Sequence, residues 1–355
     1  MRKSRHQVCR EFKKSGGKIA AVLPIHYPRA LLRAFNVLPV EVWGPPGVDT
    51  SYGGAHLQPY VCSIVHSALS FLKSGGLDET DIIIVPHGCD SLQGLGSILI
   101  DFVKPRQPVL TFYIPRGNRE EDLEFLADET RSLYSKLSDI TGLSPDTKTL
   151  MEYIKMDELA DIRLKELYTE RPIKSNKSFY ELVRMREYLP AEEFISIAER
   201  VLKNPEPNNA SGVPVIISGI VPEPMEVLSI VEEAGGYVVW DDLACCGRRL
   251  YPSGKSDDPF LRMAERILNG PPDVTKGSPI EDRFRYLLEM VKRTGARGII
   301  FYTVKFCEPE LFDLPELRNL LKSEGIPVVN IEVDINDPLP HQTVTRIEAF
   351  LEVLE

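Results

Sequence analysis

Cysteine is the residue type in this chain whose positions could do the most distinctive chemistry. The six cysteines stand at positions 9, 62, 89, 245, 246 and 307. In a chain of this length they favour metal ligands, catalytic thiols or buried apolar residues over disulfides. A mononuclear zinc site usually contains a C-x-x-C pair, and the sequence has none. Single cysteines from distant loops can instead hold an iron–sulfur cluster, while packing in the core remains the alternative role.

Three of these cysteines follow predicted elements in a related way. Cys89 comes shortly after a continuous apolar run at 81–86, and Cys307 follows a similar run at 297–303. Ligands of parallel sheets bind beyond the carboxyl ends of the strands, so both thiols are expected at a site. Cys62 lies in the first turn of a helix predicted over 60–74. Helix amino termini lower the pKa of a thiol and favour the thiolate that binds metal.

The elements that carry these cysteines alternate between strands and helices. This order predicts an α/β protein with two flavodoxin-like (Rossmann-like) domains, parallel sheets and a helical bridge. The predicted strands are 18–24, 39–44, 81–86 and 108–115 in the first half, and 213–219, 237–242, 297–303 and 327–334 in the second. A long loop is expected between 242 and a helix at 280–294. The predicted divisions are a basic N-terminal arm at 1–17, a first domain at 18–142, a bridge with its linker at 143–212, and a second domain at 213–355.

Composition excludes several classes of protein. With 355 residues, 43% hydrophobic and 26% charged, the chain is long enough for two globular domains. The net charge of −10 makes nucleic acid an unfavourable partner. The sequence shows neither a secretory signal nor an 18-residue apolar stretch, so we expect a soluble cytoplasmic protein without a membrane partner. The basic arm at 1–17 is expected to be a solvated, frayed terminus, with docking to an acidic partner as the other interpretation.

Four segments resemble one known family. They are QPYVCSIVHSAL at 58–69, IVPHGCDSL at 84–92, VVWDDLACCGRR at 238–249, and FYTVKFCEPELFDLPELRNLLKSEGIPVVNIEVD at 301–334. In this order they resemble the component D of 2-hydroxyacyl-CoA dehydratases, as in 2-hydroxyglutaryl-CoA dehydratase, and the subunits of benzoyl-CoA reductase. The last segment is the most specific, because it joins the cysteine and its acidic and proline neighbours to a helix, a GIP turn and an acidic strand end.

The resemblance implies a [4Fe-4S] cluster held by Cys62, Cys89 and Cys307, with one iron left open. It further implies a lyase that eliminates water from an (R)-2-hydroxyacyl-CoA. One electron on the thioester carbonyl makes a ketyl radical anion, which expels the 2-hydroxyl and acidifies the β proton. The implied partners are the acyl-CoA substrate, an ATP-dependent iron–sulfur activator, and a related component-D subunit or a second copy of this chain.

Other positions leave alternatives open. Cys245 and Cys246 either pack near the site or recruit further iron, as in double-cubane reductases related to the family. His26, His87 and Glu308 are the candidate acid/base residues, with structural hydrogen bonding as the competing role. The arginine pairs at 116 and 119 and at 248 and 249 are read as solvated loop charges or as contacts to CoA phosphates. Benzoyl-CoA reduction and a non-catalytic, two-lobed ligand-binding module remain the competing functions.

Overall fold

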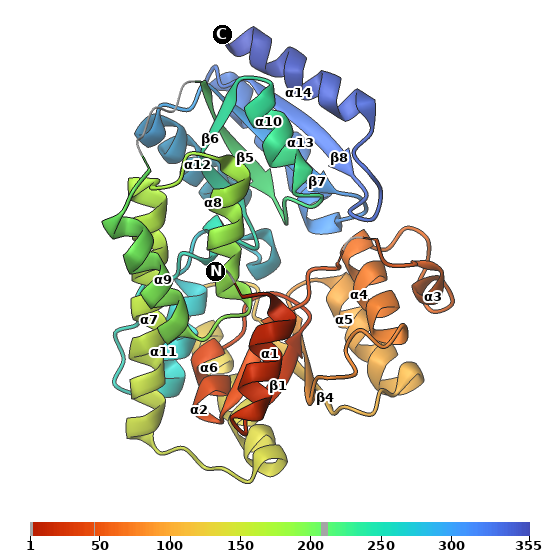
Figure 1. Ribbon diagram of the computed structural model, residues 1–355, viewed down its shortest axis with the longest axis vertical. Coiled ribbons are helices and arrows are strands. Elements are labelled where there is room, and N and C mark those ends of the chain that lie inside the picture. Colours follow the sequence, from red (N-terminus) through yellow and green to blue (C-terminus); the bar gives the residue numbers. More distant parts are fainter. Residues whose placement is uncertain (1–2, 46, 207–211) are drawn as a thin grey trace.

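Residues 3–45, 47–206 and 212–355 are described by a computed structural model, drawn as a ribbon in Figure 1. Two parallel sheets of four strands each organise the chain. The first has the order β2-β1-β3-β4 and the second the order β6-β5-β7-β8. Their strands are β1 (Lys18–Val22), β2 (Val37–Glu41), β3 (Ile82–His87), β4 (Val109–Tyr113), β5 (Val213–Gly219), β6 (Gly236–Leu243), β7 (Gly298–Val304) and β8 (Val328–Val333).

The two sheets repeat one topology, in which the first strand of each half lies between the second and the third. Ala20 of β1 pairs with Pro39 of β2 and with Ile82 of β3, and β5 has the same relation to β6 and β7. The β3 and β7 strands are buried along almost their whole length because their apolar residues are continuous, as covered parallel strands require. The predicted α/β class with two flavodoxin-like units is confirmed. We call each sheet with its helices a lobe.

Helices cover both sheets and fill the space between them (Figure 1). The first lobe has α2 (Arg29–Ala34), α3 (Ser51–Gly54), α4 (Ser63–Lys73), α5 (Asp90–Ile98) and α6 (Glu120–Thr141). The second has α10 (Glu226–Glu233), α12 (Ile280–Thr294), α13 (Glu308–Ser323) and α14 (His341–Leu354). Between the two sheets in sequence come α7 (Thr147–Glu170), α8 (Asn176–Val183) and α9 (Ala191–Lys203), helices where the bridge was expected. The linker predicted at 205–214 falls partly on 207–211, outside the described residues.

The expectation of a frayed N-terminal arm is wrong for its central part. Residues of the arm form α1 (Arg5–Lys14), which lies against the first sheet. Val8 is buried there, and the Arg5 guanidinium donates to the carbonyl of Glu41 over 2.6 Å. The Lys13 ammonium lies 3.3 Å from the Asp81 carboxylate. The helix forms because its apolar side packs on the sheet while its basic side chains find acceptors on the same lobe.

The long loop expected after β6 contains a helix, α11 (Pro259–Leu268), that the sequence-based prediction missed. Asp258 caps its amino terminus by accepting from the N–H groups of Phe260 and Leu261. Although α11 comes from the second half of the chain, it packs on α6 and α7, and Met263 and Ile267 join the core of the first lobe. The two halves are therefore interlocked through this excursion. None of the described helices is long and apolar enough to span a membrane.

Candidate iron–sulfur site

Each of the three cysteines in question precedes the first residue of a helix. Cys62 caps α4, Cys89 caps α5 and Cys307 caps α13. Two of these helices leave the carboxyl ends of equivalent strands, since α5 follows β3 and α13 follows β7. The first N–H groups of a helix have no partner inside it and carry a partial positive charge. All three sulfur atoms therefore lie where backbone geometry favours a thiolate.

The thiols of Cys62 and Cys307 face each other across the two lobes. A hydrogen bond from the Cys307 thiol lowers the pKa of Cys62, and the same interaction raises the pKa of Cys307. Cys89 is half-buried; burial raises its pKa to about 12, and the charge of Cys62 adds to this effect. The structure thus brings Cys62 and Cys307 together directly and places Cys89 within electrostatic range of Cys62.

Backbone and side-chain contacts hold the lobes together beside these thiols. The N–H of Ser63 donates to the carbonyl of Lys305 over 3.3 Å, and the Ser67 hydroxyl donates to the side-chain oxygen of Asn336 over 2.8 Å. Both contacts join α4 of the first lobe to loops that follow β7 and β8. The relative position of Cys62 and Cys307 is therefore fixed within one short stretch of each lobe.

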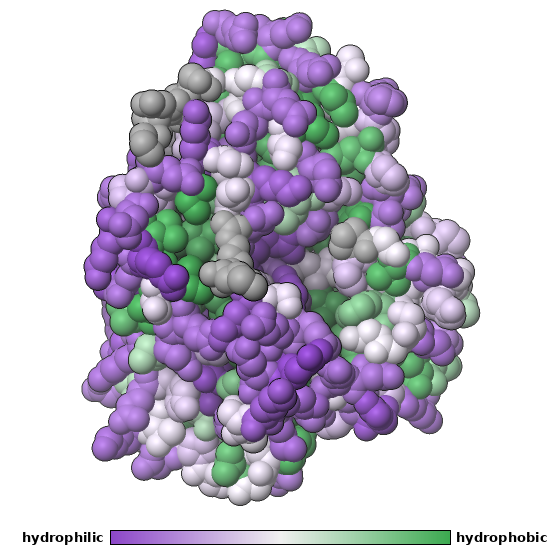
Figure 2. Space-filling view, viewed as in Figure 1, coloured by the Kyte–Doolittle hydropathy of each residue, from purple (hydrophilic) through white to green (hydrophobic). Residues whose placement is uncertain are grey.

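A hollow of about 750 Å³ adjoins the same place. It lies between the loop that leads into α4 and the loops after β7 and β8, and its polar lining includes Ser63, His66, Lys305 and Asp334. The buried Ser63 hydroxyl has no hydrogen-bond partner among the described residues. On the face shown in Figure 2 the surface is mostly hydrophilic and is hollowed where the upper and lower parts of the molecule meet.

The cysteines differ from a site for a single metal ion. Among the described residues, no three His, Cys, Asp or Glu side chains converge on one point where such an ion could bind. A cubane cluster makes a different demand, because each of its irons takes its own thiolate and the sulfur atoms stay apart. Three cysteines at helix amino termini, two of them buried, are compatible with that demand.

The candidate acid/base residues occupy different environments. His26 is buried, hydrogen-bonded to the Tyr251 hydroxyl at 2.7 Å and to Thr275 at 3.1 Å, and burial lowers its pKa. His87 is half-buried and packs edge-on against the Tyr113 ring at 4.4 Å, with no hydrogen-bond partner among the described residues; burial lowers its pKa as well. Glu308 is exposed in the first turn of α13. These three side chains are not assembled into one group.

Cys245 and Cys246 lie in a second place. Both are buried, and their sulfur atoms are 3.2 Å apart. Burial raises the pKa of Cys246, followed by the effects of Cys245 and of the Asp241 carboxylate. The pair lines a small internal cavity next to α7 and α11, and the hollow beside Ser63 is lined by other residues.

Arg248 and Arg249 are neither solvated nor available to CoA phosphates, which corrects both sequence-based interpretations of this pair. Arg248 is 0% exposed and binds Asp242 and Glu310, while Arg249 donates to Glu41 over 2.6 Å. Their partners lie far away in the sequence or inside strands. Arg116 and Arg119, by contrast, are largely exposed and pair with Asp90 and Asp122.

Sequence reasoning missed the buried acceptor at the centre of this arrangement. Glu41 accepts from Tyr27, Arg29, Trp43 and Arg249, and these cations outweigh burial, so that the pKa of Glu41 is lowered. The available signal was a lone carboxylate at the end of an otherwise apolar strand. Such a residue is rarely buried unless it is paired.

Known proteins match this chain along nearly its whole length. The (R)-phenyllactyl-CoA dehydratase beta subunit of Clostridium sporogenes is 27% identical over 98% of this chain and 94% of its own. The lactoyl-CoA dehydratase subunit beta of Anaerotignum propionicum is 26% identical over 97% and 94%, and a benzoyl-CoA reductase subunit of Thauera aromatica is 25% identical over 89% and 85%. The family described as 2-hydroxyglutaryl-CoA dehydratase, D-component, matches residues 24–354. The chain therefore belongs to the 2-hydroxyglutaryl-CoA dehydratase D-component family.

Proposed function

We propose that this protein is one subunit of a cytoplasmic iron–sulfur 2-hydroxyacyl-CoA dehydratase, and that it holds a [4Fe-4S] cluster through Cys62, Cys89 and Cys307. The observation that carries the proposal is the meeting of Cys62 and Cys307, two helix-capping thiols from different lobes, with Cys89 in electrostatic range. Family membership supports the reaction class, since relatives of this chain are dehydratase subunits.

Residues of the chain would perform three tasks at this site. The three cysteines bind the cluster, and the N–H groups that open α4, α5 and α13 stabilise its negative charge. Burial of Cys62 and Cys307 keeps water away from the metal. When bound, the cluster supplies a path for one electron toward the thioester carbonyl of an (R)-2-hydroxyacyl-CoA, from which the hydroxyl at C2 leaves.

The hollow beside Ser63 is our candidate for substrate access. Its volume of about 750 Å³ suits a small organic ligand, and one wall contains the residue next to Cys62. The Lys305 ammonium, half-buried in that wall, is positioned to orient a negatively charged or carbonyl oxygen. The exposed Glu308 remains a candidate for moving a proton. His26 is a weaker candidate because it is fully buried among its own partners.

Partner subunits follow from the relatives. Three of them are beta subunits of dehydratases, so we propose that this chain takes the beta position beside a related component-D subunit. The segment after β1 supports this assignment, because Arg29 is buried on Glu41 and offers no carboxylate to a substrate. An ATP-dependent iron–sulfur activator would supply the electron. Benzoyl-CoA reduction is the second candidate, since a subunit of benzoyl-CoA reductase is also a relative.

The test is an anaerobic activity assay of the reconstituted complex. The chain is produced with its neighbouring component-D gene product and activator, and supplied with ATP, reductant and either a panel of (R)-2-hydroxyacyl-CoAs or benzoyl-CoA. The proposal expects 2-enoyl-CoA to form and expects Cys307→Ala to abolish it, while Cys9→Ala retains it. Ring reduction of benzoyl-CoA alone would select the second candidate. An active complex with the Cys307→Ala chain would refute the site.

A further inference from the structure

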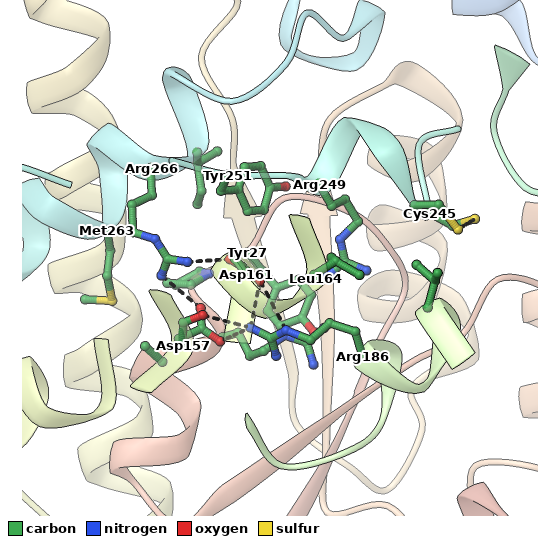
Figure 3. Close-up of a pocket in the computed structure, with 16 residues that line it drawn as sticks. Tyr27, Asp157, Asp161, Leu164, Arg186, Cys245, Arg249, Tyr251, Met263 and Arg266 are labelled. Carbon is green, nitrogen blue, oxygen red and sulfur yellow. Dashed lines mark hydrogen bonds and ion pairs between the residues drawn. The ribbon is translucent and has the colours of Figure 1, made fainter. Parts of the chain in front are cut away.

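A small closed cavity of about 30 Å³ lies where the first lobe, α7 and the excursion from the second lobe meet (Figure 3). Its lining includes four arginines, Arg29, Arg186, Arg249 and Arg266. We propose that this cavity binds a small inorganic anion of the size of chloride. The site is separate from the cysteines of the proposed cluster and does not depend on the proposed function.

The charges around the cavity do not balance. The four arginines are at most 9% exposed, and they pair with three carboxylates, Asp157, Asp161 and Glu41. Four positive charges and three negative ones leave one positive charge in excess. A buried charge without a counterion costs several kcal/mol by general estimates, roughly 3–5 when one partner of a pair is missing. An anion would remove that excess.

The carboxylates are already committed to the arginines. Figure 3 shows Arg186 and Arg266 reaching the two aspartates from different sides. Arg266 donates to Asp157 over 2.9 Å and to Asp161 over 2.5 Å, and Arg186 donates to both as well. Each of these two carboxylates is therefore shared between two guanidinium groups.

Glu41 is saturated in the same way. One of its oxygens accepts from Tyr27 and Arg29, and the other accepts from Trp43 and Arg249. It has no lone pair left for the remaining N–H groups of the two arginines. The protein thus offers these cations fewer acceptors than they have donors.

One donor of each arginine lacks an acceptor among the described residues. These are Nη1 of Arg29, Nη1 of Arg186, Nε of Arg249 and Nε of Arg266. The Arg266 Nε lies 4.0 Å from Glu158, beyond hydrogen-bonding distance. Buried donors without acceptors are rare in proteins, because each costs roughly 1–3 kcal/mol. Their clustering in the lining of one cavity indicates a ligand that accepts hydrogen bonds.

The size of the cavity restricts that ligand. One water molecule needs roughly 10–15 Å³ of such space, so about 30 Å³ holds two waters or one ion of similar bulk. Nucleotides, acyl-CoA and its phosphates are too large. A metal cation is excluded by the surrounding guanidinium groups. A halide satisfies the volume, the charge and the unpaired donors together.

Thermal unfolding of the complete chain, purified anaerobically, tests this proposal. Sodium chloride and sodium bromide are compared with sodium gluconate, whose anion cannot enter the cavity, at equal ionic strength. We expect both halides to raise Tm by about 1–3 °C in a saturating manner. Arg266→Gln removes the excess charge and should abolish the difference. Arg262→Gln, on the same helix but outside the cavity, should preserve it.

Bromide diffraction keeps the test decisive if the Arg266→Gln chain does not fold. Crystals of the unaltered chain grown in sodium bromide are measured above and below the bromine absorption edge, which separates bromine from iron. A difference peak in contact with Arg29, Arg186, Arg249 or Arg266 is expected. An empty cavity, an equal Tm response to gluconate, or a peak without any halide effect on Tm, meaning binding at crystal concentration only, would overturn the proposal.

Discussion

The Cys307 thiol donates a hydrogen bond to the Cys62 sulfur, although one residue begins α13 of the second lobe and the other begins α4 of the first. The backbone contact between Ser63 and Lys305 holds the same two segments together. A site built in this way depends on the packing of both lobes. The predictions below concern the residues that hold the cysteines in place, and the last one concerns the cysteines themselves.

Glu310 should anchor the helix that begins at Cys307. Its two carboxylate oxygens accept from Arg248 over 2.7 Å and from Arg283 over 2.8 Å, and all three side chains are buried. Glu310→Gln weakens both pairs and leaves buried positive charge, so we expect a loss of about 3 kcal/mol in the free energy of unfolding by urea. The matched control is Glu308→Gln, two residues earlier and exposed, which should change it by less than about 0.5 kcal/mol. Equal effects of the two substitutions would refute this role.

The N-terminal helix should contribute to the stability of the first lobe. Val8 is buried against the sheet, whereas its neighbour Gln7 is exposed. Val8→Asp places an unpaired charge in this contact and should lower the urea midpoint by an amount equivalent to about 2–3 kcal/mol. Gln7→Asp introduces the same side chain on the outer face and should leave the midpoint nearly unchanged. A frayed arm would give no difference between the two variants.

Lys276 should make stability depend on pH in the alkaline range. Burial lowers its pKa to about 8 from a usual 10.5, with the Asp273 carboxylate opposing this shift, and its ammonium donates to the carbonyls of Ile267 and Gly270. Between these two values the unfolded chain binds more protons than the folded one. The free energy of unfolding should therefore rise with pH across that window, by up to about 3 kcal/mol from this group.

Urea unfolding at pH 8 and at pH 10 measures this contribution of Lys276. Lys276→Met should remove part of the rise, while Lys292→Met, at an exposed position of α12, should retain it. Cysteines and tyrosines titrate alike in all three proteins, so the comparison isolates one side chain. The same rise in the Lys276→Met protein would contradict the assignment.

The sequence allowed the sheets to be located but not all the helices. Continuous apolar runs predicted all eight strands to within a few residues, because strands buried on both faces leave a strong signal. The α11 helix was taken for a loop, since Pro, Gly and Ser precede it and its apolar face packs on a distant part of the chain. The α1 helix was missed because its basic residues suggested a solvated arm.

The site was predictable only in part, for a physical reason. The position of Cys89 and Cys307 after equivalent strands follows from local order, and the structure has them at helix caps as expected. The burial of Arg248 and Arg249 does not follow from local order, because Glu41 and Glu310 lie far from them in the sequence. Pairing over such separations depends on the folded arrangement. Solvation was therefore the wrong expectation for this arginine pair.

Iron and sulfide content after anaerobic purification tests the central claim most directly. The account predicts about four iron and four sulfide ions per chain, and a loss of most of both in each of Cys62→Ala, Cys89→Ala and Cys307→Ala, with circular dichroism unchanged. Cys9→Ala and the double variant Cys245→Ala with Cys246→Ala should retain the full content. Undiminished iron in the Cys62→Ala and Cys307→Ala chains, or its loss only in the double variant, would contradict the account.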